Sequence, residues 1–269
     1  MFSLPTEPGS IGHTLDAGFK LYFVGFKRLI VLGILAVLSV VVPVFIAVFP
    51  FVLSMGSGQD PSAGMITMLA VAVFVAMGFY MWFYLAAMCR IGSIAYGQDL
   101  GLGPCIGMGL RRLFPVFIAS ILYMLAMTLG YILLIIPGMI VWVTLAFFPL
   151  CIILEGDGII ESLRHSHRLV WGNWWRTAII GTVVLVIYYV ISIAIEIPFI
   201  IVAEVLSDPD AGNGAKIVEM VLSTTGRVLS AVVTFPLLVS VYVVVFHDLK
   251  LRKEGHDLDA RVEALTAGA

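Results

Sequence analysis

Two charged residues stand near the ends of neighbouring apolar runs. Glu196 lies 19 residues beyond Thr177, and Arg227 lies 19 residues before Phe246. If the two runs cross a membrane in opposite directions, both charges reach a similar depth. A charge within a membrane is costly and generally finds a partner. We therefore expect Glu196 and Arg227 to form a buried ion pair between two spans, with a role in handling a substrate or a proton as the alternative.

The segment from residue 155 to residue 176 combines cationic and indole side chains. Tryptophan is enriched at the level of lipid headgroups, and clustered basic residues favour anionic lipids. We predict lipid headgroup contacts here, with membrane topology and interfacial anchoring as the simpler explanation. The six residues concerned are Arg164, Arg168, Trp171, Trp174, Trp175 and Arg176.

The spacing of other polar residues argues against catalysis and metal binding. His165 and His167 are two residues apart and therefore face different directions on a helix, whereas helical metal-binding pairs are four apart. Glu155 and Asp157 are a pair suited to acid–base chemistry, but no nucleophile accompanies them, and a loop is the better interpretation. We predict no catalytic, metal-binding or cofactor-binding residue, no cofactor and no enzymatic activity.

The composition indicates that the chain is dissolved in a lipid bilayer. Of its 269 residues, 61% are hydrophobic and 12% are charged, whereas a soluble protein is about 25% charged. The apolar residues form long uncharged runs, which are typical of membrane spans. The net charge of −2 argues against nucleic acid as a partner. We interpret the cysteines at 89, 105 and 151 as small residues with reduced thiols. We expect no cleavable signal peptide, because the N-terminus is polar.

These runs predict an all-α fold, a polytopic membrane helix bundle with amphipathic helices on its cytoplasmic face. We expect a single integral membrane domain in which an amphipathic helix at 10–28 precedes the spans and a polar cytoplasmic tail occupies 247–269.

The stretch 113–154 holds 42 residues without a charge, too many for one span of about 20 residues. We predict a hairpin that turns at Pro137-Gly138, and leave open whether it crosses the bilayer fully. The six predicted spans are 29–53, 65–89, 113–136, 139–154, 177–195 and 228–246.

The basic residues predict the orientation. When both termini and the segments 90–112 and 155–176 share one side, that side holds 13 of the 15 lysines and arginines. The positive-inside rule makes this side cytoplasmic.

Several motifs resemble those of a group of bacterial membrane proteins. They are Ile136-Pro137-Gly138, Phe147-Phe148-Pro149, Glu155-Gly156, the runs from Glu161 to Ser166 and from Leu169 to Arg176, and the tail from His247 to Gly255. On these motifs the chain is similar to the YciC-like uncharacterised inner-membrane proteins and to the membrane domain of some glycerophosphodiester phosphodiesterases. The resemblance implies an all-helical, roughly six-span protein of the bacterial inner (plasma) membrane, and it implies no catalytic residue in this chain.

Taken together, these patterns predict a non-enzymatic scaffold or accessory protein of the envelope. Its expected partners are membrane lipids and another membrane protein or a second copy of itself. The alternative is a small transporter or lipid-handling channel, which requires polar side chains to meet inside the bundle. The available hydroxyl groups belong to Ser120, Tyr123, Thr128, Tyr131, Thr144, Thr182, Tyr188, Tyr189, Ser192 and Thr234.

Overall fold

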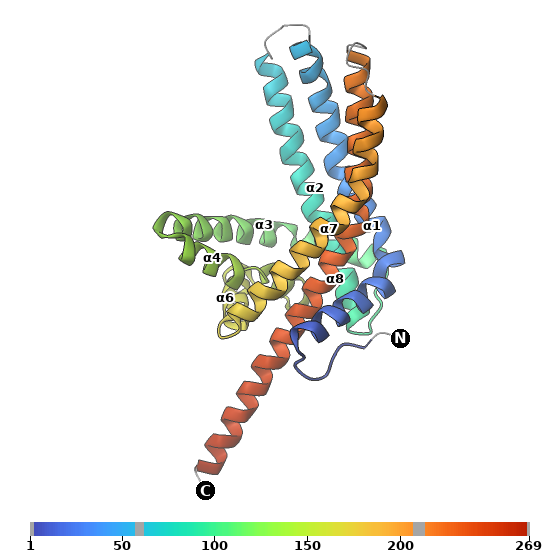
Figure 1. Cartoon of the computed structure of the whole chain (residues 1–269). Helices are drawn as coiled ribbons and strands as arrows, with labels where there is room; N and C mark the ends of the chain where they lie inside the picture. The colour runs from blue at the N-terminus through green and yellow to red at the C-terminus, as the bar shows by residue number, and fades with distance from the viewer. Residues whose placement is uncertain (1–2, 57–61, 207–212, 268–269) are drawn as a thin grey trace. The chain divides into compact units, whose positions relative to one another are not determined.

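A computed structural model describes residues 3–56, 62–206 and 213–267, which form helices and turns without a strand (Figure 1). The helices are α1 (Ile11–Gly56), α2 (Ala63–Ala95), α3 (Leu102–Leu133), α4 (Ile135–Thr144), α5 (Phe148–Leu150), the π-helix η1 (Cys151–Glu155), α6 (Ile159–Val170), α7 (Trp174–Leu206) and α8 (Asn213–Ala267). Six helical segments are long and apolar enough to cross a membrane, the fourth being Ile135–Glu155. The predicted all-α fold with six candidate spans is confirmed.

Several helices continue through boundaries that the sequence had suggested. The predicted surface helix at 10–28 and the first span are both parts of α1, and the predicted tail continues α8. Prolines 43, 50, 115, 198 and 236 all lie inside helices. In a bilayer every backbone N–H and C=O group needs a hydrogen-bond partner from the protein. A helix that continues through a proline therefore costs less free energy than a break that leaves several of these groups without partners.

The hairpin between α3 and α4 turns at Leu134, three residues before the predicted Pro137-Gly138 turn. Leu134 is extended, with φ −168° and ψ 155°, and its N–H donates to the Gly130 carbonyl at 3.0 Å. Pro137 instead lies in the first turn of α4, where a missing N–H costs little. Gly130 allows α3 to pack closely against α4, because a Cβ on Gly130 would lie 2.9 Å from the Gly138 Cα.

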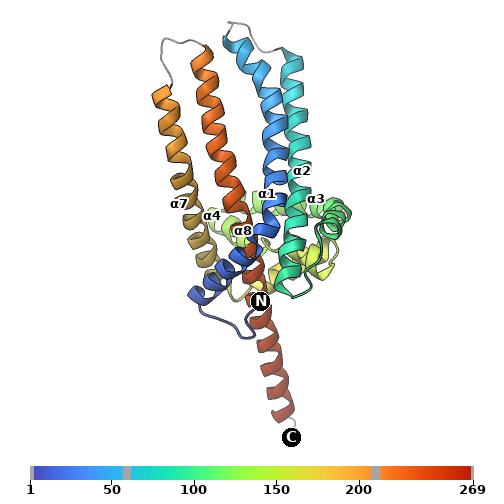
Figure 2. The ribbon, with the colours of Figure 1, turned by 90° about the vertical axis from the view of Figure 1, so that its right-hand side faces the viewer.

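The described helices divide between two compact units, and α1, α2, α7 and α8 contribute to both. Unit 1 comprises Met1–Lys27, Leu85–Val184 and Leu237–Ala269, and unit 2 comprises Arg28–Tyr84 and Leu185–Pro236. In unit 2, segments of these four helices run side by side (Figure 2). Phe235 makes edge contacts with Tyr80 and Tyr84, with ring centroids 6.3 and 6.1 Å apart.

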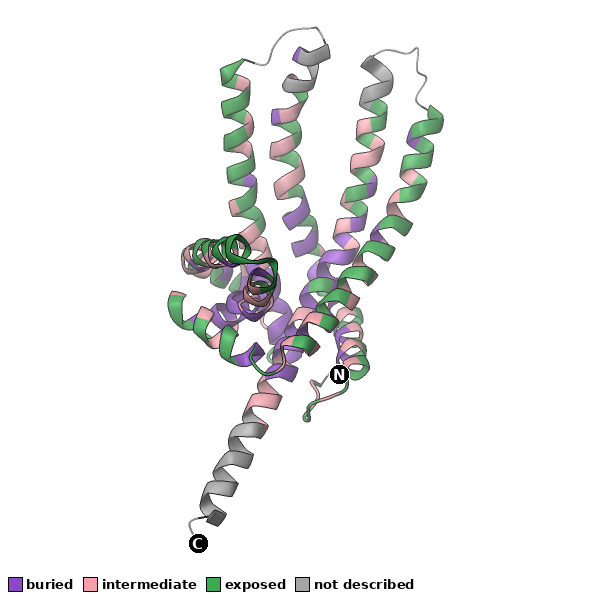
Figure 3. Cartoon of the chain, turned by 60° about the vertical axis from the view of Figure 1, so that its left-hand side comes forward, coloured by how far each residue is buried: buried purple, intermediate pink, exposed green. Residues whose placement is uncertain are grey.

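Exposed residues, shown in green in Figure 3, lie along the long helices, and many of them are apolar. Phe74 is 63% exposed and Val71 57%, both on α2. Exposed apolar surface on this scale suits contact with lipid rather than with water.

The buried residues of unit 1 form the core that positions the candidate site. Helix α8 buries most of its residues from Leu237 to Phe246, and η1 buries Cys151, Ile152 and Ile153. A Cβ on Gly18 would lie 2.8 Å from a methyl group of Val241. The glycine therefore allows α1 and α8 to approach closely within this unit.

Candidate functional site

Helix α6 has three distinct sides. The buried side carries two serines and two aliphatic residues: Ser162, Ser166, Leu169 and Val170. The second side is apolar, with Ile160 65% exposed and Trp171, the residue after the helix, 57% exposed. The third side is polar and carries Glu161, Arg164, His165 and Arg168. A helix of this kind can pack on protein with one side while offering an apolar and a cationic side to a membrane surface.

Ser166 attaches α6 to the turn between α4 and α5. Its hydroxyl donates to the Thr144 carbonyl at 2.8 Å and accepts the Phe147 N–H at 3.0 Å. These bonds satisfy two backbone groups that have left the helical ladder. Ser162 is also buried, and its hydroxyl donates to the Ile159 carbonyl within its own helix.

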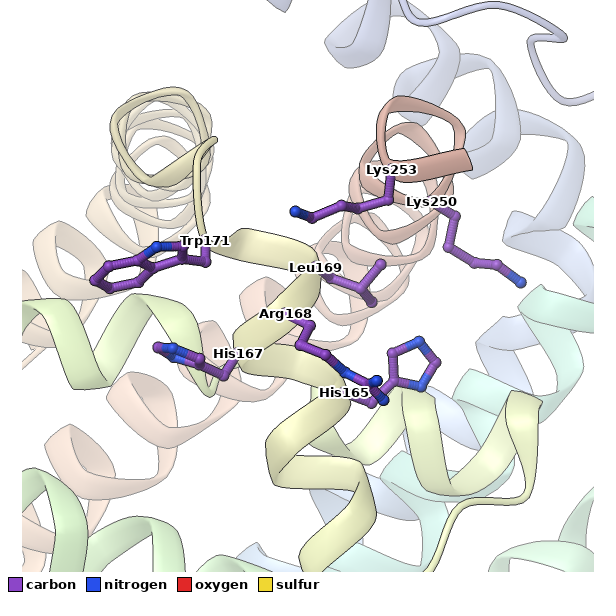
Figure 4. A pocket seen from close by; sticks show the side chains of 7 residues that line it. All are labelled: His165, His167, Arg168, Leu169, Trp171, Lys250 and Lys253. Atoms are coloured by element: carbon purple, nitrogen blue, oxygen red, sulfur yellow. The ribbon is translucent and has the colours of Figure 1, made fainter. Parts of the chain in front are cut away.

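A basic pocket lies between α6 and α8 (Figure 4). Its volume is about 570 Å³, and it is lined by His165, His167, Arg168, Leu169, Trp171, Lys250 and Lys253. The lining residues that the structure describes contain three cationic side chains and no carboxylate. An anion is therefore the complementary ligand.

The three cations of this basic pocket have different surroundings. Arg168 bonds to Glu161 at 3.1 Å, and Lys250 bonds to Glu155 at 2.7 Å. Among the residues whose side chains the structure describes, no ion pair or hydrogen bond joins the Lys253 side chain to another residue. In Figure 4 its side chain extends from α8 toward Trp171, whereas the Lys250 side chain points away. Lys253 is therefore the cation best placed to bind an anion.

The structure brings only two of the six predicted headgroup residues, Arg168 and Trp171, into the basic pocket. Arg164 is exposed and lies 3.6 Å from Glu161. Trp174 and Trp175 pack edge to face at the start of α7, with ring centroids 4.5 Å apart, and Trp175 is 74% exposed.

Arg176, the sixth predicted headgroup residue, points into the protein. Its guanidinium bonds to the Asp248 carboxylate at 3.0 Å, the Gly9 carbonyl at 2.8 Å and the Thr14 hydroxyl at 2.9 Å. Only 17% of its side chain is exposed. The structure therefore corrects the headgroup role predicted for Arg176, because its Nε and Nη2 groups bond within the protein.

A second cluster lies at the start of α6, where Cys151, Asp157 and His165 converge. Their sulfur, oxygen and nitrogen donor atoms all lie within 4.8 Å of one another. The Asp157 Oδ2 and His165 Nδ1 atoms are 2.6 Å apart, which is a short hydrogen bond. Cys151 is fully buried. Sequence spacing did not reveal this cluster, because a π-helix and a loop separate the cysteine from the helix that carries the histidine.

A family model described as Domain of unknown function (DUF7847) matches residues 89–247, more than half of the chain. The chain belongs to this family. The DUF7847 domain contains α3 to α6 and the cluster of Cys151, Asp157 and His165, but it ends before Lys250 and Lys253. No solved structure matches the chain.

The two predicted pairing residues, Glu196 and Arg227, both lie in unit 2 and within the DUF7847 domain. Glu196 is half-buried and Arg227 is exposed, so the predicted burial is wrong for Arg227. Among the described residues, no ion pair within 4.0 Å joins the two side chains. The apolar residues around each charge in the sequence indicated that burying it would be costly. They could not predict how each helix is rotated about its axis, and this rotation decides which way the charged side chain points.

Proposed function

We propose that this DUF7847 protein is a non-enzymatic integral protein of the bacterial inner membrane that binds the phosphate headgroup of an anionic lipid in the basic pocket beside α6. The observation behind this proposal is the 570 Å³ pocket, whose described lining has three cations and no carboxylate. A lipid phosphate is a strong hydrogen-bond acceptor, and bonds between ionised partners are about twice as strong as neutral ones.

The apolar side of α6 supports a lipid over a free phosphate ion. Ile160 and Trp171 are exposed beside the basic side of the same helix. Acyl chains can cover these residues while the headgroup meets Arg168 and Lys253. Trp175 adds an exposed indole of the kind enriched at the membrane interface.

The distribution of lysine and arginine supports a cytoplasmic location for this pocket. Thirteen of the 15 basic residues belong to the predicted cytoplasmic side, including Arg168 and Lys253. Anionic lipids attract basic segments on that face of the membrane, with about 1 kcal/mol per Lys or Arg near the surface. This location fits a scaffold or accessory role in the envelope.

Quenching of Trp171 fluorescence by brominated lipids tests the proposal. The protein has five tryptophans, so the other four are replaced by phenylalanine and the variant is reconstituted in bilayers. We expect brominated phosphatidylglycerol to quench Trp171 more strongly than brominated phosphatidylcholine, because the anionic lipid is enriched at the pocket. Equal quenching by the two lipids would overturn the proposal.

Two double variants test whether the preference for the anionic lipid arises in the basic pocket. Arg168→Gln with Lys253→Gln removes two pocket cations, and we expect it to abolish the preference for the anionic lipid. The control, Lys20→Gln with Lys27→Gln, removes the same charge from α1, where Lys20 pairs with Asp16. This control should keep the preference. Inorganic phosphate added at high concentration should not remove the preference if the occupant is a lipid.

A further inference from the structure

We propose that Cys151, Asp157 and His165 form a binding site for a divalent cation of the zinc class. The inference goes beyond lipid binding and rests on a different set of contacts. Three donor atoms converge at this site, an unusual backbone brings them together, and two of the donor side chains are partly exposed.

The three donors suit a single cation. Their donor atoms lie within 4.8 Å of one another, and in a tetrahedral zinc site donor atoms are roughly 3.3–3.6 Å apart given the usual bond lengths. Small rotations of the side chains can therefore close the site. The 2.6 Å hydrogen bond between Asp157 and His165 has to open as the cation takes the place of the shared proton.

The backbone that holds Cys151 is a π-helix, a rare conformation that occurs often at functional sites. Helix η1 spans Cys151–Glu155 and ends at Gly156, which has a φ of 80°. The left-handed Gly156 turns the chain back, and the Asp157 N–H donates to the Cys151 carbonyl at 3.2 Å. This turn places the Asp157 carboxylate beside the Cys151 thiol.

His165 reaches the same point from α6, which the buried Ser166 fixes in place. The two bonds of the Ser166 hydroxyl connect α6 to Thr144 and Phe147, on the segment that leads into η1. The position of the imidazole relative to Cys151 is therefore set by protein packing. Preorganised ligands of this kind reduce the cost of binding a metal.

The donor set selects the class of metal. Sulfur, nitrogen and carboxylate oxygen are the usual ligands of zinc, whereas Mg²⁺ and Ca²⁺ prefer oxygen alone. Binding forms metal–sulfur, metal–nitrogen and metal–oxygen bonds and releases the Cys151 thiol proton to water. The proton shared by Asp157 and the Nδ1 atom of His165 moves through water to the Nε2 atom of the neutral imidazole. The thiolate and the carboxylate then balance the two positive charges of the cation. An uncharged assembly is favoured in a poorly solvated site.

The site adjoins the basic pocket, because His165 belongs to its lining. The side chains of His165 and Asp157 are 25% and 18% exposed, while Cys151 is buried behind them. Three protein ligands leave a fourth tetrahedral position for water or for an oxygen anion from the pocket.

Cobalt substitution tests the site in the full-length protein, purified in detergent without a histidine tag and treated with a chelator. We expect Co²⁺ to bind with a stoichiometry of one and to produce a thiolate-to-cobalt charge-transfer band, which Zn²⁺ then displaces. Each of Cys151→Ser, Asp157→Asn and His165→Gln should weaken binding by at least about tenfold. Cys151→Ser should also abolish the charge-transfer band.

Two matched variants complete the experiment. His167→Gln removes the neighbouring histidine on α6, and Cys105→Ser removes another buried cysteine; both should keep the band and the affinity. Absence of the band in the parent protein, or its persistence in Cys151→Ser, would overturn the proposal. The partly exposed Asp157 and His165 provide variants that should fold even if Cys151→Ser does not. The lipid preference of Trp171 should survive in Asp157→Asn, so the two proposals can fail separately.

Discussion

Arg176 and Asp248 are 72 residues apart in the sequence, yet Nη2 of the arginine lies 3.0 Å from Oδ2 of the aspartate. The Asp248 carboxylate also accepts bonds from Arg252 at 3.0 Å and from the Gly9 N–H at 3.0 Å. It therefore connects the N-terminal segment, the start of α7 and helix α8 within unit 1. The side chain of Asp248 is 7% exposed, so water can replace these partners only poorly.

Replacement of Asp248 by asparagine should destabilise the protein. The variant leaves Arg176 and Arg252 without their shared anion, and removal of one partner from a buried pair costs about 3–5 kcal/mol. Because the two arginines are 17% and 23% exposed, we expect a smaller loss of about 2–4 kcal/mol. Unfolding in detergent measures the loss. A double-mutant cycle with Arg176→Gln should show coupling, and strict additivity would contradict the direct pairing.

Two glycines on α3 should respond to alanine in opposite ways. A Cβ on Gly130 would lie 2.9 Å from the Gly138 Cα, so Gly130→Ala must push α3 and α4 apart, at a cost of about 1–3 kcal/mol. Gly107 has no heavy atom within 4 Å of an added Cβ. Gly107→Ala should therefore be neutral or stabilising by up to about 1 kcal/mol, because alanine favours a helix. Equal effects on the unfolding midpoint would argue against close packing at the hairpin.

Hydropathy was sufficient to predict the six candidate spans but not the exact positions of breaks. Pro137-Gly138 looked like the turn, yet the first turn of a helix tolerates proline, and the chain breaks at Leu134 instead. Leucine is not a residue type that indicates a turn. The extended conformation of Leu134 accompanies the close packing of Gly130 on Gly138, a contact between two helices that a local sequence pattern does not reveal.

The candidate site was predictable only where it depends on composition. Arg168 and Trp171 were expected at a membrane surface because of their residue types, and they line the basic pocket. Lys253 joins them from α8, a contact that depends on tertiary packing. Cys151 and Asp157 meet through the π-helix and the left-handed Gly156, neither of which has a periodic signature. Arg176 was misassigned because charge alone does not distinguish a lipid contact from an internal ion pair.

The serine that fixes α6 should matter more than its neighbour one turn away. Ser166→Ala leaves the Thr144 carbonyl and the Phe147 N–H without their partner, and each buried unsatisfied group costs about 1–3 kcal/mol. Ser162→Ala removes only a bond within α6, to the Ile159 carbonyl, which keeps its helical environment. We expect the free energy of unfolding to fall clearly for Ser166→Ala and by less than about 1 kcal/mol for Ser162→Ala. A reversed order would show that Ser166 does not anchor the helix.

Single engineered cysteines should report the predicted orientation in intact cells. The three native cysteines are free and buried, so they should react little with a membrane-impermeant thiol reagent. Gln98 is exposed in the turn after α2, on the predicted cytoplasmic side, and Ala63 is exposed at the opposite end of that helix. Added outside the membrane, the reagent should label Ala63→Cys and leave Gln98→Cys unlabelled until the membrane is permeabilised. The reverse pattern would place the basic residues outside, against the expected distribution of positive charge, and would put the basic pocket on the other face.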